Sequence, residues 1–143
     1  MIELTEIAPS DASVDDTLTI AFDLRQKSRF SATTEKGEQV GLFFSRGHIL
    51  RSGTVLTGPE NYNVLIKAAD ESVSVMRSTD TVAFSKACYH LGNRHVSLQI
   101  LDAELRFLSD HVLDQMLEGL GLKVEHEMLP FEPEAGAYHT HDH

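Results

Sequence analysis

Hydrophobic and polar residues alternate along much of the first half of the chain, which is the pattern of half-buried β-strands. The clearest case is residues 17–24, where one face is made of Leu18, Ile20, Phe22 and Leu24. Further strands are predicted over residues 29–33, 39–44 and 63–67, with a hairpin turn at residues 35–38. No segment in this half keeps helical spacing over three turns. The pattern therefore predicts a small all-β N-terminal domain over residues 1–71.

The second half changes period several times. A strand at residues 72–76 precedes a helix whose apolar stripe runs from Ala83 to Leu91, with an N-cap at Asp80 and a stop at Gly92-Asn93. Strands are predicted at residues 95–101 and 104–108, then a helix between Asp110 and Gly121, then a strand at residues 122–129. This βαββαβ order predicts a ferredoxin-like domain over residues 72–134, with both helices on one face of an antiparallel sheet. The fold class is therefore α+β, and residues 135–143 are expected to form a flexible tail.

Charge and composition exclude several function classes. Among 143 residues there are 12 Lys and Arg against 22 Asp and Glu, a net charge of −10, which does not suit binding to nucleic acid. No apolar run is long enough to span a membrane, and the N-terminus lacks the features of a signal peptide, so a cytoplasmic location is the default expectation. The single cysteine, Cys88, lies on the apolar stripe of the first helix and is interpreted as a core residue.

A short basic row interrupts this acidic composition. Every second residue from 25 to 29 is basic, so one face of the expected strands would carry Arg25, Lys27 and Arg29. The row is either a solvated strand face or a docking surface for a protein partner.

Eight histidines suggest metal binding. His139, His141 and His143 alternate at the C-terminal end, where neutral imidazoles on a flexible segment suit Ni²⁺, Cu²⁺ or Zn²⁺. A purification-tag remnant or a solvated tail is the other interpretation. If the strand at residues 95–101 includes His95, this side chain lies opposite the apolar face, as a metal ligand or as an ordinary surface histidine. His111 follows the cap Asp110 at a helix N-terminus, where the dipole favours a neutral imidazole.

The other histidines are interpreted as structural or carry no inference. His90 lies at the edge of the helical stripe, and His126 shares parity with apolar strand residues, so it is expected to be partly buried and hydrogen-bonded. We find no nucleophile elbow, phosphate-binding loop, zinc-hydrolase motif or paired cysteines, and the sequence gives little reason to expect an enzyme.

Three long runs of the sequence resemble the urease accessory protein UreE family of nickel metallochaperones. They are ACYHLGNRHVSLQI at residues 87–100, DHVLDQML at residues 110–117 and LPFEPEAGAYH at residues 129–139. Residues 45–47 and 50–56 of the first domain, which read SRG and LRSGTVL, are similar to the same family. The resemblance implies a protein- or peptide-binding N-terminal domain and a homodimer in which two copies of His95 hold one Ni²⁺, supplemented by histidines of the tail. It also implies delivery of nickel to the urease apoprotein together with other accessory proteins, one of them a GTPase.

One departure from the family pattern concerns His111. Some members carry another histidine just before the Asp-His pair of the second helix, whereas here Leu108 and Ser109 precede it. The second, peripheral site that the family pattern implies therefore rests on His111 alone. Two other functions remain open: a metal buffer in which the histidine tail does the binding, and a protein-interaction scaffold that uses the basic row of the first domain.

Overall fold

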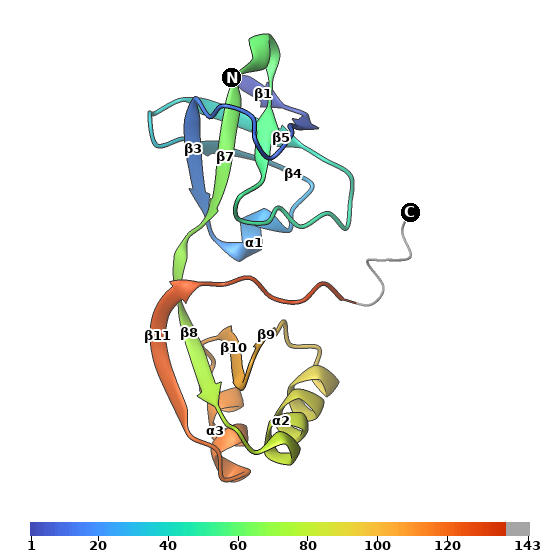
Figure 1. The fold of residues 1–143 in the computed structure, drawn as a ribbon, viewed down its shortest axis with the longest axis vertical. Helices are drawn as coiled ribbons and strands as arrows, with labels where there is room; N and C mark the ends of the chain where they lie inside the picture. The colour runs from blue at the N-terminus through green and yellow to red at the C-terminus, as the bar shows by residue number, and fades with distance from the viewer. Residues whose placement is uncertain (137–143) are drawn as a thin grey trace. The chain divides into compact units, whose positions relative to one another are not determined.

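The computed structural model describes residues 1–136, which form two compact units, Met1–Ala69 and Asp70–Gly136 (Figure 1). The first unit is built mainly of short strands. Its strands and two short helices are β1 (Ile2–Leu4), β2 (Glu6–Ile7), β3 (Asp16–Ile20), α1 (Phe22–Arg25), β4 (Arg29–Thr33), β5 (Gln39–Phe43), β6 (Val55–Thr57), the 3-10 helix η1 (Pro59–Asn61) and β7 (Asn63–Ala68).

Two sheets make up this first unit. One has the strand order β1-β5-β4 and the other the order β2-β6-β7-β3, with parallel pairs at β1–β5 and β3–β7. The predicted hairpin joins β4 to β5 in antiparallel register, and Gly37 takes the left-handed backbone that its turn requires, with a φ of 88°. Alternate residues of both sheets, among them Leu18, Val40, Leu42 and Ile66, form one core.

The strand predicted over residues 17–24 ends early. After Ile20 the chain turns into α1, a single helical turn, and both Phe22 and Arg25 are buried there. The Arg25 side chain has 0% exposure, and it donates hydrogen bonds from Nε to the carbonyl of Ile20 (3.2 Å) and from Nη1 to the carbonyl of Leu50 (3.3 Å). Lys27 is exposed. The expected basic row is therefore wrong as a strand face, because Arg25 points inward to satisfy backbone carbonyls.

The second unit has the predicted order of elements. They are β8 (Asp70–Arg77), α2 (Thr81–Asn93), β9 (Gln99–Leu101), β10 (Glu104–Leu108), α3 (His111–Gly119) and β11 (Val124–Pro130). The four strands form one sheet in the order β11-β8-β10-β9, and every neighbouring pair is antiparallel. This arrangement confirms the ferredoxin-like prediction.

Both helices pack on the same face of this sheet, as Figure 1 shows. Ala87 and Leu91 of α2 and Leu117 of α3 share one buried cluster with Met76 and Phe107 of the strands. Asp80 and Asp110 cap the helices as predicted, because each carboxylate accepts the second and third backbone N–H groups of its helix. Cys88 is half-buried against this cluster, and burial raises the pKa of its thiol.

No helix among residues 1–136 combines the length and the hydropathy that a membrane span requires.

Candidate metal site

His95 lies in the tight turn that ends α2, and it does not belong to the following strand. The helix continues through Asn93, and β9 begins only at Gln99. The prediction that Gly92-Asn93 ends the helix and that a strand starts at His95 is therefore wrong in detail. Strand alternation therefore does not determine the direction of the His95 side chain.

The end of α2 is a Schellman motif with histidine in the position that glycine usually occupies. The N–H of His95 bonds to the carbonyl of Gly92 (2.9 Å), and the N–H of Val96 bonds to the carbonyl of Leu91 (3.2 Å). His95 takes the left-handed conformation, with a φ of 59°. Val96 then packs against the core cluster and holds the turn in place. The exposed His95 imidazole therefore extends from a fixed backbone position.

The end of α3 shows the ordinary version of the same turn. Here the N–H of Gly121 bonds to the carbonyl of Glu118 (2.9 Å), and the N–H of Leu122 bonds to the carbonyl of Leu117 (3.1 Å). Gly121 has a φ of 83°. Since a non-glycine residue in this conformation is strained, the histidine at the end of α2 is a departure that stability alone does not explain.

Exposed apolar side chains lie on the two elements that flank His95. Tyr89 on α2 is 67% exposed, and Ile100 on β9 is 43% exposed. Strand β9 is an edge of the sheet, so one side of its backbone has no strand neighbour. His90 is half-buried, and its ring contacts Tyr89 edge to face at 5.2 Å between centroids.

The segment after β11, residues 131–136, forms a strap that returns to this same edge. The N–H of Glu132 donates to Oε1 of Gln99 (3.0 Å), and the N–H of Glu134 donates to the carbonyl of Leu98 (2.6 Å). The strap therefore lies beside residues 98 and 99, which follow the turn that carries His95. His139, His141 and His143 lie outside the described residues.

The remaining histidines occupy separate surroundings. His111 is exposed at the start of α3, and its Nε2 lies 3.1 Å from Nε2 of Gln115. His126 on β11 is hydrogen-bonded, as predicted, but its side chain is 57% exposed instead of partly buried. Among residues 1–136, no three His, Cys, Asp or Glu side chains converge so that they could hold a metal ion. Within this described part of the chain, neither His95 nor His111 therefore belongs to a complete metal site.

Sequence reasoning missed a buried polar link between α3 and the sheet. The carboxylate of Asp114 accepts a hydrogen bond from Oγ of Ser74 (2.6 Å) and lies 2.7 Å from Nε2 of His126. A polar residue on the inner face of a helix was the only signal for it. Because Asp114 and Ser74 are both buried, this link fixes how α3 sits on the sheet.

Comparison with known proteins gives one consistent result. The family model of the N-terminal domain of the UreE urease accessory protein matches residues 2–69, and that of its C-terminal domain matches residues 71–143. The chain belongs to the UreE urease accessory protein family. The matched regions together span both units of this UreE family member, and they include the turn at His95.

Individual relatives are similar over nearly their whole length. Urease accessory protein UreE of Alkalilimnicola ehrlichii is 54% identical over 138 residues, which cover 96% of this chain and 85% of the relative. UreE of Escherichia coli O157:H7 is 49% identical over 149 residues, with coverage of 100% and 96%. UreE of a Pseudomonas putida strain is 47% identical over 144 residues, with coverage of 100% and 89%.

Proposed function

We propose that this chain is a non-catalytic nickel metallochaperone that acts in urease maturation in the cytoplasm. Membership of the UreE family and the shared name of its relatives, urease accessory protein, support the role in maturation. The observation that carries the metal-binding part is the position of His95. An exposed imidazole on a rigid, strained helix end is better explained as a ligand than as a stabilising residue.

Nickel is the cargo in this proposal, and two copies of the chain hold one ion between their His95 side chains. A homodimer is proposed because, among residues 1–136, His95 belongs to no group of three potential metal ligands. The exposed Tyr89 and Ile100 beside it offer an apolar surface for a second copy. In a two-fold symmetric contact a residue near the axis meets its own counterpart, so a single histidine per chain supplies two ligands.

The histidine tail completes the site from nearby. The strap is fixed at Glu134, beside Leu98, and His139 follows only five residues later along the chain. Five residues can span up to about 17 Å, and this reach supports His139 as a ligand beside His95. His141 and His143 extend this reach.

An open site of this kind suits delivery better than storage. Two imidazoles leave most positions of a Ni²⁺ ion to water or to mobile tail ligands, so a partner with more ligands can take the ion. The proposed recipient is the urease apoprotein, in a complex with other accessory proteins that include a GTPase. Because imidazole binds metal only when neutral, we expect nickel affinity to fall as the solution is acidified.

The test is calorimetric titration of Ni²⁺ into the full chain and into two variants. We expect His95→Ala to abolish the tightest site, whereas His111→Ala leaves that site unchanged. The mass of the native protein, measured with and without Ni²⁺, should give one ion per dimer. An unchanged tightest site in His95→Ala, or one ion per monomer, would contradict the proposal.

A truncation separates the chaperone from a metal buffer that binds through its tail. Removing residues 139–143 should lower the total number of bound ions and keep the site at the dimer interface. A buffer would instead lose most of its capacity together with its tightest site.

A further inference from the structure

The strap, residues 131–136, starts at one edge of the second sheet and is bound at the other edge (Figure 1). It follows directly after β11, whereas its two hydrogen bonds are made to Leu98 and Gln99, at the start of β9. Strands β8 and β10 lie between these edges, so the sheet is about 14 Å wide, from three strand spacings of about 4.8 Å. The strap therefore brings the chain across the sheet to the segment that follows the turn at His95.

The backbone donors in the middle of the strap are all used. Pro133 has no N–H, so the donors here are those of its two neighbours, Glu132 and Glu134. The first donates to Oε1 of Gln99 (3.0 Å), and the second donates to the carbonyl of Leu98 (2.6 Å). Pro133 itself is buried. The strap is therefore a bound part of the second unit as far as Glu134.

This binding shortens the tether of the histidine tail. His139 follows Glu134 by five residues. Without the two hydrogen bonds, the tether would begin at the fully buried Phe131, next to β11, and would have eight residues. A flexible chain spans about 5.5 Å times the square root of its length. The longer tether and its start about 14 Å from β9 would together lower the local concentration of His139 beside β9 about fivefold.

We propose that Gln99 and Glu134 position the histidine tail for nickel binding, and that they act through the strap and not as ligands. This inference rests on the proposed function, in which His95 of two copies and the tail share one ion. Gln99 supplies the acceptor from the edge of the sheet, and Glu134 supplies the donor from the strap. Since the strap lies at an edge, it can be released locally while the core of the unit stays folded.

Both hydrogen bonds can be removed by substitution, and the chain offers a matched control. Gln99→Met keeps the length of the side chain and removes the acceptor, and Glu134→Pro removes the donor. The control combines Leu101→Met with Glu134→Gln. It places methionine on the same face of β9 and loses the same charge, but it keeps both hydrogen bonds.

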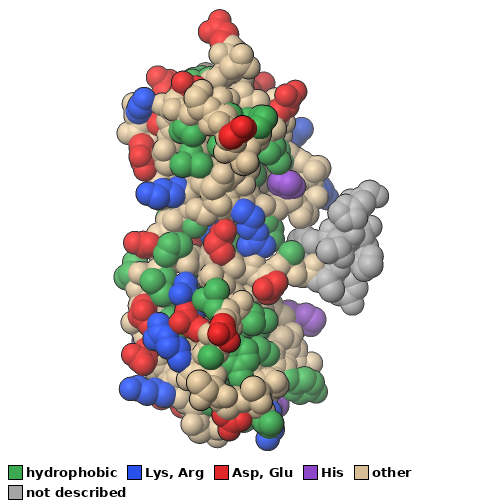
Figure 2. Space-filling model, viewed as in Figure 1, with side chains coloured by type: hydrophobic (Ala, Val, Ile, Leu, Met, Phe, Trp, Pro, Cys, Tyr) green, Lys and Arg blue, Asp and Glu red, His purple; other side chains and the backbone are tan. Residues whose placement is uncertain are grey.

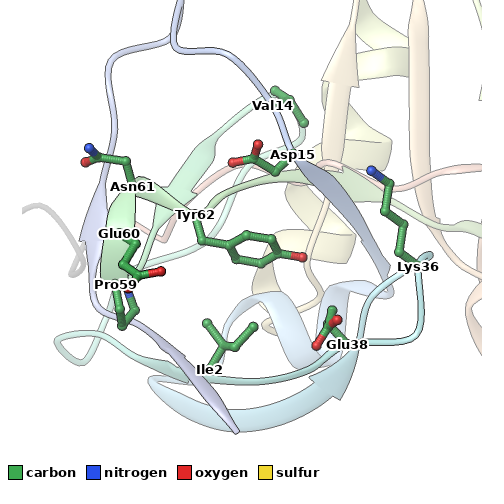
Figure 3. A pocket seen from close by; sticks show the side chains of 9 residues that line it. All are labelled: Ile2, Val14, Asp15, Lys36, Glu38, Pro59, Glu60, Asn61 and Tyr62. Carbon is green, nitrogen blue, oxygen red and sulfur yellow. The ribbon is translucent and has the colours of Figure 1, made fainter.

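Carboxylates elsewhere on the chain contribute only a background to nickel titration. Figure 2 shows Asp and Glu side chains spread over the face that it draws, and such a surface attracts cations. In the first unit, Asp15, Glu38 and Glu60 stand around the ring of Tyr62 in a cavity of about 660 Å³ (Figure 3). Among residues 1–136, however, no three potential ligands converge so that they could hold a metal ion. The charge-matched control corrects for this background.

The experiment titrates Ni²⁺ by calorimetry into the double variant and its control, each as the full chain and with residues 139–143 removed. Amide exchange in the strap reports whether the strap has been released. In the full chain, we expect faster exchange and a tightest site that is about two- to fivefold weaker in the variant than in the control. In the shortened chain, we expect equal affinities, because no histidine tail is left to position.

Three outcomes would overturn the proposal. One is a strap that stays protected from exchange in the double variant, and another is equal affinity of variant and control in the full chain. The third is a loss of the same size in the shortened chain, because the substitutions would then act on the dimer site itself. Failure of the proposed function has a different signature, since His95→Ala would then leave the tightest site unchanged.

Discussion

Replacing His95 by glycine should make the protein more stable and unable to hold nickel at its tightest site. Histidine occupies the left-handed position of the α2 turn with a φ of 59°, whereas glycine occupies the same position after α3. The left-handed conformation costs a non-glycine residue about 1–2 kcal/mol, and the cost for histidine is at the lower end of this range. Glycine loses about 0.4–1 kcal/mol more backbone entropy on folding, which offsets part of the gain. We therefore expect His95→Gly to stabilise the second unit by about 0.5 kcal/mol.

Three matched variants separate backbone strain from loss of the side chain. His95→Ala keeps the strained backbone and should change stability little, because the imidazole is exposed. Gly121→Ala should destabilise by about 0.5–1 kcal/mol, since a Cβ there meets no atom within 4 Å and only the backbone is strained. Ala103→Gly, at a φ of 55° in the β9–β10 turn, should stabilise like His95→Gly and leave nickel binding intact.

The assay is urea unfolding followed by circular dichroism at the helix band, with a chelator present so that bound metal adds no stability. The two longest helices, α2 and α3, belong to the second unit, so the signal reports on that unit. With a denaturant slope of about 1 kcal/mol/M, the expected gain moves the midpoint by about 0.5 M. The reasoning fails if His95→Gly is no more stable than His95→Ala, because the strain would then be absent.

Three further predictions concern the second unit. Burial acts to raise the pKa of Glu104, but hydrogen bonds from Arg77 and Arg106 outweigh it and lower the pKa below its usual value. Glu104 therefore stabilises the folded state above the unfolded pKa of 4.5. This stabilisation is lost as the pH falls through the pKa of Glu104 in the folded state. Glu104→Gln should therefore destabilise at pH 7 by about 1 kcal/mol and flatten the acid limb of the stability–pH curve, and an equally steep limb would contradict this. Asp110→Ala removes the cap of α3 and should cost about 1 kcal/mol in urea unfolding, with recovery in Asp110→Asn. Gln99→Ala removes a side-chain acceptor of the strap, so amide exchange in residues 131–136 should accelerate while the core strands keep their protection.

Much of this protein follows from local patterns in the sequence. Alternation with period two identifies most strands, and the helical stripes ending at Leu91 and Leu120 identify both long helices. Asp80 and Asp110 mark where those helices begin, because an N-cap acts within its own turn. The order of these elements was sufficient to predict the ferredoxin-like sheet.

The details of the candidate site depended on tertiary structure. The apolar pairs Leu91–Val96 and Leu117–Leu122 have the same spacing, and that spacing was the signal for two equivalent helix ends. The signal is weak when histidine replaces glycine, because residue preference then argues against a left-handed backbone. The packing of Val96 on the core, together with the two hydrogen bonds of the turn, holds His95 in that conformation.

Interactions between distant residues explain the rest of what the sequence did not predict. Arg25 follows the alternation of a strand, but its guanidinium is buried against the carbonyl of Leu50, which lies 25 residues away. Asp114 lies on the inward face of α3, where its carboxylate contacts the side chains of Ser74 and His126 of the sheet. Periodicity determines which face of an element is apolar, whereas the partner of a buried polar group is determined only once the elements are packed together.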